Sequence, residues 1–212
     1  KIFGDKYSIS KLCKKYNLKI IDDLEDILGL EDIDFIISIQ YHKILKPRHI
    51  RIANKLAINL HMAPLPEYRG CNQYSFAIYN EEKEFGTTIH RLEEGIDSGA
   101  IISERRFKIK SNENVESLYL KTLSESKILF KDSLPTILNQ NHNLISQEKL
   151  KNKNSRFYKR SDIDSLKIID LNSGEEEILR RVNSTAMPGF EQPYAYIDGQ
   201  KYYIIPERNL KL

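Results

Sequence analysis

The sequence predicts an α/β fold with a mostly parallel sheet. Short apolar runs of strand type recur between amphipathic stretches with helical spacing, an alternation typical of helices that cover a parallel sheet. The run 34–39, DFIISI, is apolar almost throughout, as strands buried on both faces are. A length of 212 residues suits one main hydrophobic core with a small appendage.

The N-terminal half contains three apolar runs of strand type and two helical segments. Residues 9–16 follow Ser8, whose hydroxyl can cap a helix. Pro47 marks a turn before a short helix. The expected elements are a helix over 9–16, strands over 18–21, 34–39 and 57–61, and a short helix after Pro47.

Turn-forming residues separate the elements of the second half. Pro64, Pro66 and Gly70 mark a loop, and Asn72 can cap a helix that ends near Tyr79. Asp198-Gly199, between apolar and aromatic residues, predicts a hairpin over 195–205. The remaining expected elements are strands over 87–92 and 100–109, a helix over 113–138, an exposed polar run over 139–143 and a helix over 175–183.

Composition excludes several classes of protein. The net charge of +3 is spread over interspersed signs, so the sequence predicts neither a nucleic-acid partner nor a membrane partner. The apolar runs are too short to cross a bilayer. Cys13 and Cys71 are the only cysteines and lack metal-ligand spacing, which predicts no metal and a reduced, cytoplasmic setting. The chain opens at Lys1 without a secretory leader pattern.

Three polar residues stand where an α/β sheet places its ligands. Asn59 and His61 are two apart near the end of the expected strand 57–61, so they share one face at its carboxyl end. Asp97 lies in the polar turn 93–99, EEGIDSG. These groups can converge on a reaction centre, although an Asn, a His and an Asp also serve as ordinary hydrogen-bonded structure.

The stretch 58–102 carries a more specific pattern. It contains Asn-x-His, a proline-containing loop with YRG, and the later Gly-x-Asp-x-Gly, in that order. In this it resembles the signature region of the folate-dependent formyltransferases, which include methionyl-tRNA formyltransferase, glycinamide ribonucleotide transformylase and the nucleotide-sugar N-formyltransferases. The resemblance implies a Rossmann-like core, preceded by a βαβ unit that is not visible in this sequence.

The resemblance also implies roles for individual residues. Asn59, His61 and Asp97 correspond to the family's catalytic residues, and an amine attacking a formyl carbonyl does need a base and a donor for the oxyanion. The implied co-substrate is N10-formyltetrahydrofolate. Its expected contacts are the loop residues Ala63, Pro64, Leu65, Pro66, Leu92, Glu93 and Gly95, although the prolines also suit a stiff loop and Gly95 a turn.

The C-terminal part of the chain narrows the choice of substrate that accepts the formyl group. Methionyl-tRNA formyltransferases add a basic β-barrel domain, whereas the tail here has no one-sign field. The segments LPEYRGCNQYSFAI, SRFYKR and YAYIDGQKYYI resemble the sugar-nucleotide N-formyltransferases, in particular those acting on dTDP-linked amino sugars for surface polysaccharides. The expected acceptor contacts are His42, Lys43, Arg69, Gln73 and Tyr194. Two alternatives stay open: the RFYKR run also suits a solvated basic turn, and Tyr194 also suits packing within the hairpin.

The same resemblance divides the chain into a catalytic domain over 1–150 and an extension over 151–212 with a helix and a hairpin. Because the C-terminal part of the sugar formyltransferases forms a dimer interface, the resemblance also implies a homodimer. Four other functions stay open. A formyltransferase for another amine would use the same site on a different acceptor, and a formyl-folate hydrolase would use the same three residues on water. A nucleotide-sugar binding module would not need all three together, and a structural protein would leave the ordered signature unexplained.

Overall fold

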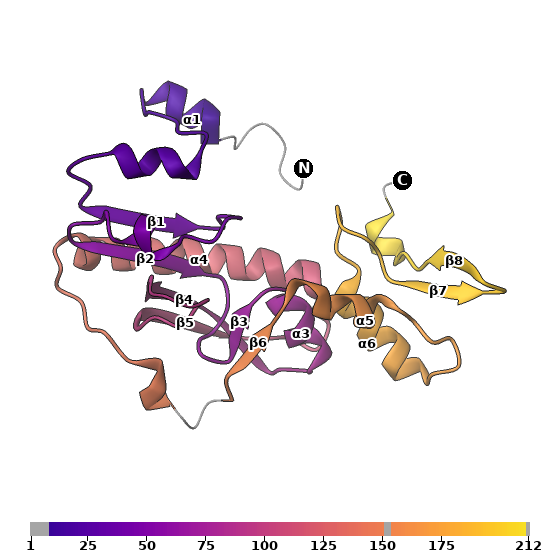
Figure 1. Cartoon of the computed structure of the whole chain (residues 1–212). Helices are drawn as coiled ribbons and strands as arrows, with labels where there is room; N and C mark the ends of the chain where they lie inside the picture. Colours follow the sequence, from indigo (N-terminus) through magenta and orange to yellow (C-terminus); the bar gives the residue numbers. More distant parts are fainter. Residues whose placement is uncertain (1–8, 151–153, 211–212) are drawn as a thin grey trace.

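The computed structural model describes residues 9–150 and 154–210 and has a four-stranded sheet at its centre, in the order β1-β2-β4-β5 (Figure 1). The strands are β1 Phe35–Ile39, β2 Leu56–His61, β3 Tyr68–Gly70, β4 Glu84–Arg91, β5 Ile101–Lys108, β6 Arg156–Tyr158, β7 Tyr194–Ile197 and β8 Gln200–Tyr203. The helices are α1 Ile9–Lys15, α2 Pro47–Ile50, α3 Gln73–Tyr79, α4 Val115–Leu138, α5 Asp164–Lys167 and α6 Glu175–Thr185, with short 3-10 turns η2 Leu24–Gly29, η3 Gln147–Leu150, η4 Arg160–Ile163 and η5 Glu207–Asn209.

The α/β class with a C-terminal helix and hairpin is confirmed, and the described strands of the central sheet pair in a mixed way. β1 and β2 are parallel, as expected. β4 runs antiparallel to both β2 and β5. The short loop between β4 and β5 explains the second of these pairings, because a parallel return needs a long crossover.

Helix α4 covers the sheet and begins where the sequence places it. The Asn114 side chain caps its first turn by accepting from the N–H groups of Glu116 and Ser117. Leu129 and Ile137 of α4 are buried in one cluster with apolar residues of β2 and β4. This layer fixes the strands that carry the polar residues of the site.

A second cluster lies around α3 and extends to the expected C-terminal extension. Phe76 and Phe85 are buried with Leu118 and Leu166. Tyr158 of β6 stacks on Phe76 with ring centroids 3.9 Å apart. The first three residues of the RFYKR run form β6, which pairs with β3 in parallel. This part of the run is therefore a strand and not a solvated turn.

The C-terminal residues form a small cluster of their own. Ile169, Val182, Ala186 and Ala195 are buried together, and the hairpin β7–β8 lies at one end of the molecule (Figure 1). Its turn has positive φ at Asp198 and Gly199, as the Asp-Gly pair predicts for a two-residue hairpin. The division of the chain at residue 150 stays a prediction.

Two local expectations are wrong, and one lies outside the described residues. Residues 18–21 form no strand, and Leu18 and Ile20 are half exposed, because none of the strands in residues 9–150 and 154–210 pairs with them to complete a hydrogen-bond ladder. Asn72 occupies the position before α3 but makes no cap bond; its side chain donates instead to the carbonyls of Lys159 and Arg160. Ser8 lies outside the described residues.

None of the helices in the described residues is both long and apolar enough to span a membrane.

The β4–α4 layer gives a direct test of the fold. Ile89 is fully buried between sheet and helix, so Ile89→Ala leaves a cavity and is expected to lower the free energy of unfolding by about 2–5 kcal/mol. Ile44→Ala is the matched control, because Ile44 is 69% exposed and such a change shifts stability by only about 0.5 kcal/mol. Equal effects of the two changes in urea denaturation would contradict this packing.

Candidate active site

Strands β2 and β4 present three polar side chains at one place. Asn59 and His61 are two residues apart on β2, so their side chains lie on the same face of the sheet. The antiparallel register sets His90 of β4 opposite Asn59, and Asn59 Nδ2 lies 3.2 Å from His90 Nε2. Both His61 and His90 are buried.

Asp97 completes the group from the loop between β4 and β5. One carboxylate oxygen lies 3.6 Å from His61 Nδ1 and 3.5 Å from His90 Nε2. The other accepts a hydrogen bond of 2.9 Å from the backbone N–H of Gly70. The structure thus brings together Asn59, His61 and Asp97, as the sequence predicts.

The hydrogen bonds fix which nitrogen of each imidazole carries a proton. His61 Nε2 lies 2.7 Å from the carbonyl oxygen of Tyr68, and a carbonyl only accepts, so Nε2 donates. His90 Nδ1 in the same way donates to the carbonyl oxygen of Arg91 at 2.9 Å. The free lone pair of neutral His61 is therefore on Nδ1, beside Asp97.

Burial and nearby charge determine the protonation states of His61 and Asp97. Burial is the largest influence on His61 and lowers its pKa below the usual 6.5, against the opposing effect of the Asp97 charge and the Tyr68 carbonyl. Burial by itself raises the pKa of Asp97. Contact with His90, the charge of His61 and the N–H of Gly70 outweigh it and lower that pKa to about 2. At neutral pH the site holds an ionised carboxylate next to a neutral imidazole.

His90 is the residue that the sequence analysis missed. It lies within the expected strand 87–92, where an isolated histidine has an ordinary structural explanation. Only the strand register shows that it faces Asn59. An alternating polar residue on the neighbouring strand is the signal that points to it, once the two strands are known to pair.

The predicted folate loop is largely buried. Ala63 and Leu65 have no exposed surface, so neither their side chains nor their main-chain atoms are open to solvent. Thr88 already bonds two of these groups: its hydroxyl donates to the Ala63 carbonyl at 2.8 Å and accepts from the Leu65 N–H at 3.3 Å. Pro64 and Pro66 are buried as well, and Pro66 borders a cavity of about 390 Å³.

The other predicted folate residues lie in the loop that carries Asp97. Leu92 is partly exposed, while Glu93 and Gly95 are exposed. Leu92 donates its N–H to the carbonyl of Ala57 at 2.8 Å, which ties the start of the loop to β2. The loop therefore offers accessible groups beside Asp97.

The predicted acceptor residues fall into separate groups. His42 and Lys43 are exposed and follow β1, whose carboxyl end lies beside that of its parallel neighbour β2. Gln73 begins α3. Tyr194 begins β7 of the C-terminal hairpin, where Lys201 Nζ lies 3.6 Å from the centre of its ring; its role as an acceptor contact stays a prediction.

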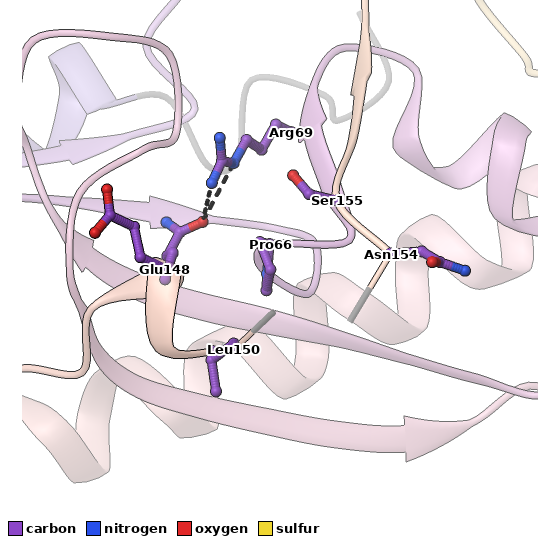
Figure 2. A pocket seen from close by; sticks show the side chains of 7 residues that line it. Pro66, Arg69, Glu148, Leu150, Asn154 and Ser155 are labelled. Carbon is purple, nitrogen blue, oxygen red and sulfur yellow. Dashed lines mark hydrogen bonds between the residues drawn. The ribbon is translucent and has the colours of Figure 1, made fainter. Parts of the chain in front are cut away.

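Arg69 borders the same cavity as Pro66, together with residues of η3 (Figure 2). Its guanidinium is held by Gln147, whose Oε1 accepts from Nε at 3.2 Å and from Nη2 at 2.8 Å. The dashed lines in Figure 2 mark these two bonds. Gln147 carries no signal in the sequence, because 78 residues separate it from Arg69.

No group of three or more His, Cys, Asp or Glu side chains in residues 9–150 and 154–210 is arranged to hold a metal ion.

Residues 11–134 match the sequence profile of the family described as formyl transferase. The chain belongs to the formyl transferase family. It is 33% identical over 188 residues, 89% of its length, to the bifunctional polymyxin resistance protein ArnA of Wigglesworthia glossinidia brevipalpis, and 29% identical over 82% of its length to GDP-perosamine N-formyltransferase of Brucella melitensis. It spans 27% and 64% of these two relatives, and 47% of the methionyl-tRNA formyltransferase of Staphylococcus aureus, to which it is 31% identical.

Solved structures of family members share the fold. The chain superposes on the N-formyltransferase of Helicobacter canadensis, solved with folinic acid and dTDP-3-aminofucose, with a TM-score of 0.76 and 28% identity, over 91% of this chain and 68% of that one. A 4-N formyltransferase of Francisella tularensis gives a TM-score of 0.80 at 25% identity, over 97% of this chain and 84% of that one. The α/β architecture described above is thus that of sugar N-formyltransferase structures.

The loop that carries Asp97 depends on a close backbone contact at Gly99. A Cβ atom built on Gly99 would lie 1.9 Å from the Arg91 carbonyl oxygen. Gly99→Ala is therefore expected to move the loop and to lower the free energy of unfolding by about 1–3 kcal/mol. Gly174→Ala, with open space around its added Cβ, is the control in thermal denaturation. A Gly99→Ala protein as stable as that control would contradict the described loop.

Proposed function

We propose that this protein transfers a formyl group from N10-formyltetrahydrofolate to the amino group of a nucleotide-linked amino sugar. The observation that carries the proposal is the convergence of Asn59, His61 and Asp97 in one buried site at the end of β2. Family membership and the sugar N-formyltransferase structures support this reaction class.

His61 has the properties of the base. An attacking amine loses a proton as its nitrogen bonds to the formyl carbon. The neutral His61 accepts that proton at Nδ1, because Nε2 is already a donor to the Tyr68 carbonyl. Asp97, 3.6 Å from Nδ1, then stabilises the imidazolium, as the third member of other catalytic triads does. The proton finally passes to the departing folate nitrogen as its bond to the formyl carbon breaks.

Asn59 supplies the second requirement, a donor for the oxygen that becomes negative. Its amide has two N–H donors, and His90 Nε2 holds the amide by accepting one of them. The other N–H is left for the carbonyl oxygen. Its orientation is set before the reaction begins, which is the condition for effective oxyanion stabilisation.

The folate supplies the formyl group, and the residues present suit it. The loop 92–97 exposes Glu93 and Gly95 beside Asp97, and the loop 63–66 borders a cavity through Pro66. Two family structures, the Helicobacter canadensis enzyme solved with folinic acid and a sugar 3N-formyl transferase solved with dTDP and 5-N-formyl-THF, support a reduced formyl folate as co-substrate. We assign the loop residues named from the sequence to this ligand.

For the acceptor we propose a dTDP-linked amino sugar first. The structures solved with dTDP-3-aminofucose and with dTDP support this choice, and the relative named for GDP-perosamine makes a guanine nucleotide the second candidate. Arg69, His42 and Lys43 are the proposed phosphate contacts, and Gln73 a contact to sugar or base. A homodimer, a cytoplasmic setting and a role in surface-polysaccharide synthesis complete the proposal.

The reaction is tested by incubating the protein with N10-formyltetrahydrofolate and a panel of dTDP-, UDP- and GDP-linked amino sugars, with mass spectrometry of the products. A formylated nucleotide sugar is the expected product and identifies the acceptor. Free formate without a sugar product would establish a hydrolase, and binding without folate consumption would leave a nucleotide-sugar binding module.

His61→Ala and Asn59→Ala test the two roles separately. Loss of the base is expected to lower kcat by about 100- to 10,000-fold, and loss of the oxyanion donor by about 100- to 1,000-fold. Circular dichroism should show both variants folded. His42→Ala, which changes an exposed proposed phosphate contact, should instead raise the KM for the acceptor with kcat retained. Full activity of either folded site variant would exclude the mechanism.

The pH dependence follows from the lowered pKa of His61. A base works when unprotonated, so the acid limb of kcat/KM should have its midpoint below pH 6.5. Asp97→Asn removes the charge that raises the pKa of His61, so the fall should shift to lower pH and the plateau should drop. An acid limb centred above pH 6.5 in the wild-type protein would contradict this role of His61.

A further inference from the structure

A buried glutamine outside the proposed catalytic group connects two parts of it. Gln147 is the first residue of η3 and is 6% exposed. The antiparallel bridge between Ile101 and Ile145 holds the preceding segment against β5. A buried carboxamide must find partners for both its oxygen and its nitrogen, and those partners show what Gln147 does.

The bonds of Gln147 admit only one orientation of its amide. The side facing Arg69 meets two guanidinium donors and must be the oxygen. The other side lies 2.9 Å from the Asp97 carbonyl and 2.8 Å from the Gly99 carbonyl. Carbonyls only accept, so this side must be the nitrogen, and a glutamate cannot replace it.

These bonds close a ring around the Asp97 loop. Gly70, next to Arg69 in β3, donates to the Asp97 carboxylate. Gln147 holds Arg69 on one side and the Asp97 main chain on the other. Asp97 has a φ of +51°, a left-handed conformation that is unfavourable for a non-glycine residue and persists only where its surroundings enforce it. The two carbonyl bonds from Gln147 provide that enforcement.

We propose that Gln147 is a positioning residue for the transfer reaction: it holds the Asp97 loop so that the carboxylate stays beside His61, and it ties that loop to Arg69. This role rests on the proposed function. It also gives a physical link between the cavity that Arg69 borders and the reaction centre, through one side chain rather than through a chain of packed residues.

The test compares Gln147→Met and Gln147→Glu in the natural protein. Methionine keeps the volume but loses all four bonds. Glutamate keeps an acceptor for Arg69 but turns an oxygen toward the carbonyls of Asp97 and Gly99. If Gln147 served only to fill space or to hold Arg69, glutamate would restore function. A positioning role for Asp97 predicts that both variants lose kcat by about 100-fold, with the acceptor KM changed by less than the kcat.

A second measurement, the NMR titration of His61, does not depend on catalytic turnover. His61 is faced by Asp97 from the loop and by His90 from β4. When the Asp97 carboxylate moves away in Gln147→Met, the titration of His61 followed by NMR should shift to lower pH, because an opposite charge favours imidazolium. Lys149→Gln, an exposed change in the same short helix, should leave both kcat and the titration unchanged.

The outcomes separate the two proposals. Wild-type protein without any formyl transfer would refute the function, while the NMR titration would still decide the link between Gln147 and Asp97. Wild-type kcat and titration in either Gln147 variant would overturn the positioning role. If the methionine variant does not fold, Gln147→Asn, whose shorter amide cannot span both sets of partners, is measured in the same two ways.

Discussion

A buried carboxylate is the constraint on which the site depends. Asp97 loses most of its hydration where it lies, and an ionised group in that position must be stabilised by its neighbours. Gly70 of β3 donates its N–H to the carboxylate, and the imidazoles of His61 on β2 and His90 on β4 lie 3.6 Å and 3.5 Å from it. The ionisation of Asp97 therefore depends on how β2, β3 and β4 are arranged relative to one another.

The sheet makes this compensation possible. The antiparallel register of β2 and β4 sets His90 opposite Asn59, and the short loop after β4 returns the chain so that Asp97 reaches the same edge. The parallel pairing of β3 with β6 fixes the segment of Tyr68 and Gly70. A main-chain carbonyl of that segment selects the tautomer of His61, so a short two-stranded ribbon takes part in defining the chemistry.

Neutral imidazole and ionised carboxylate form a useful starting state. A base must be unprotonated to accept a proton, and its conjugate acid must be stabilised once formed. Burial provides the first condition for His61, and proximity to Asp97 provides the second. The same low-polarity surroundings strengthen both effects, because charges interact more strongly away from water.

The sequence by itself determined the α/β class, the strands at 34–39 and 57–61, the long helix at 113–138 and the hairpin turn at Asp198-Gly199. Each of these depends on local periodicity or turn chemistry, which neighbouring residues carry. It also singled out Asn59, His61 and Asp97, because their order forms a recognisable pattern. The strand expected at 18–21 failed, since apolar composition does not say whether a neighbouring strand is there to pair with it.

Only the tertiary structure decided the contacts of His90 and Gln147, the mixed pairing of the sheet and the strand at Arg156–Tyr158. Gln147 meets Arg69 and Asp97 across 78 and 50 residues of chain, and Asn59 meets His90 through strand register. Such contacts are fixed by how elements pack and pair. A linear pattern does not encode them, because the partners of a buried polar group are chosen by distance in space and not by distance along the chain.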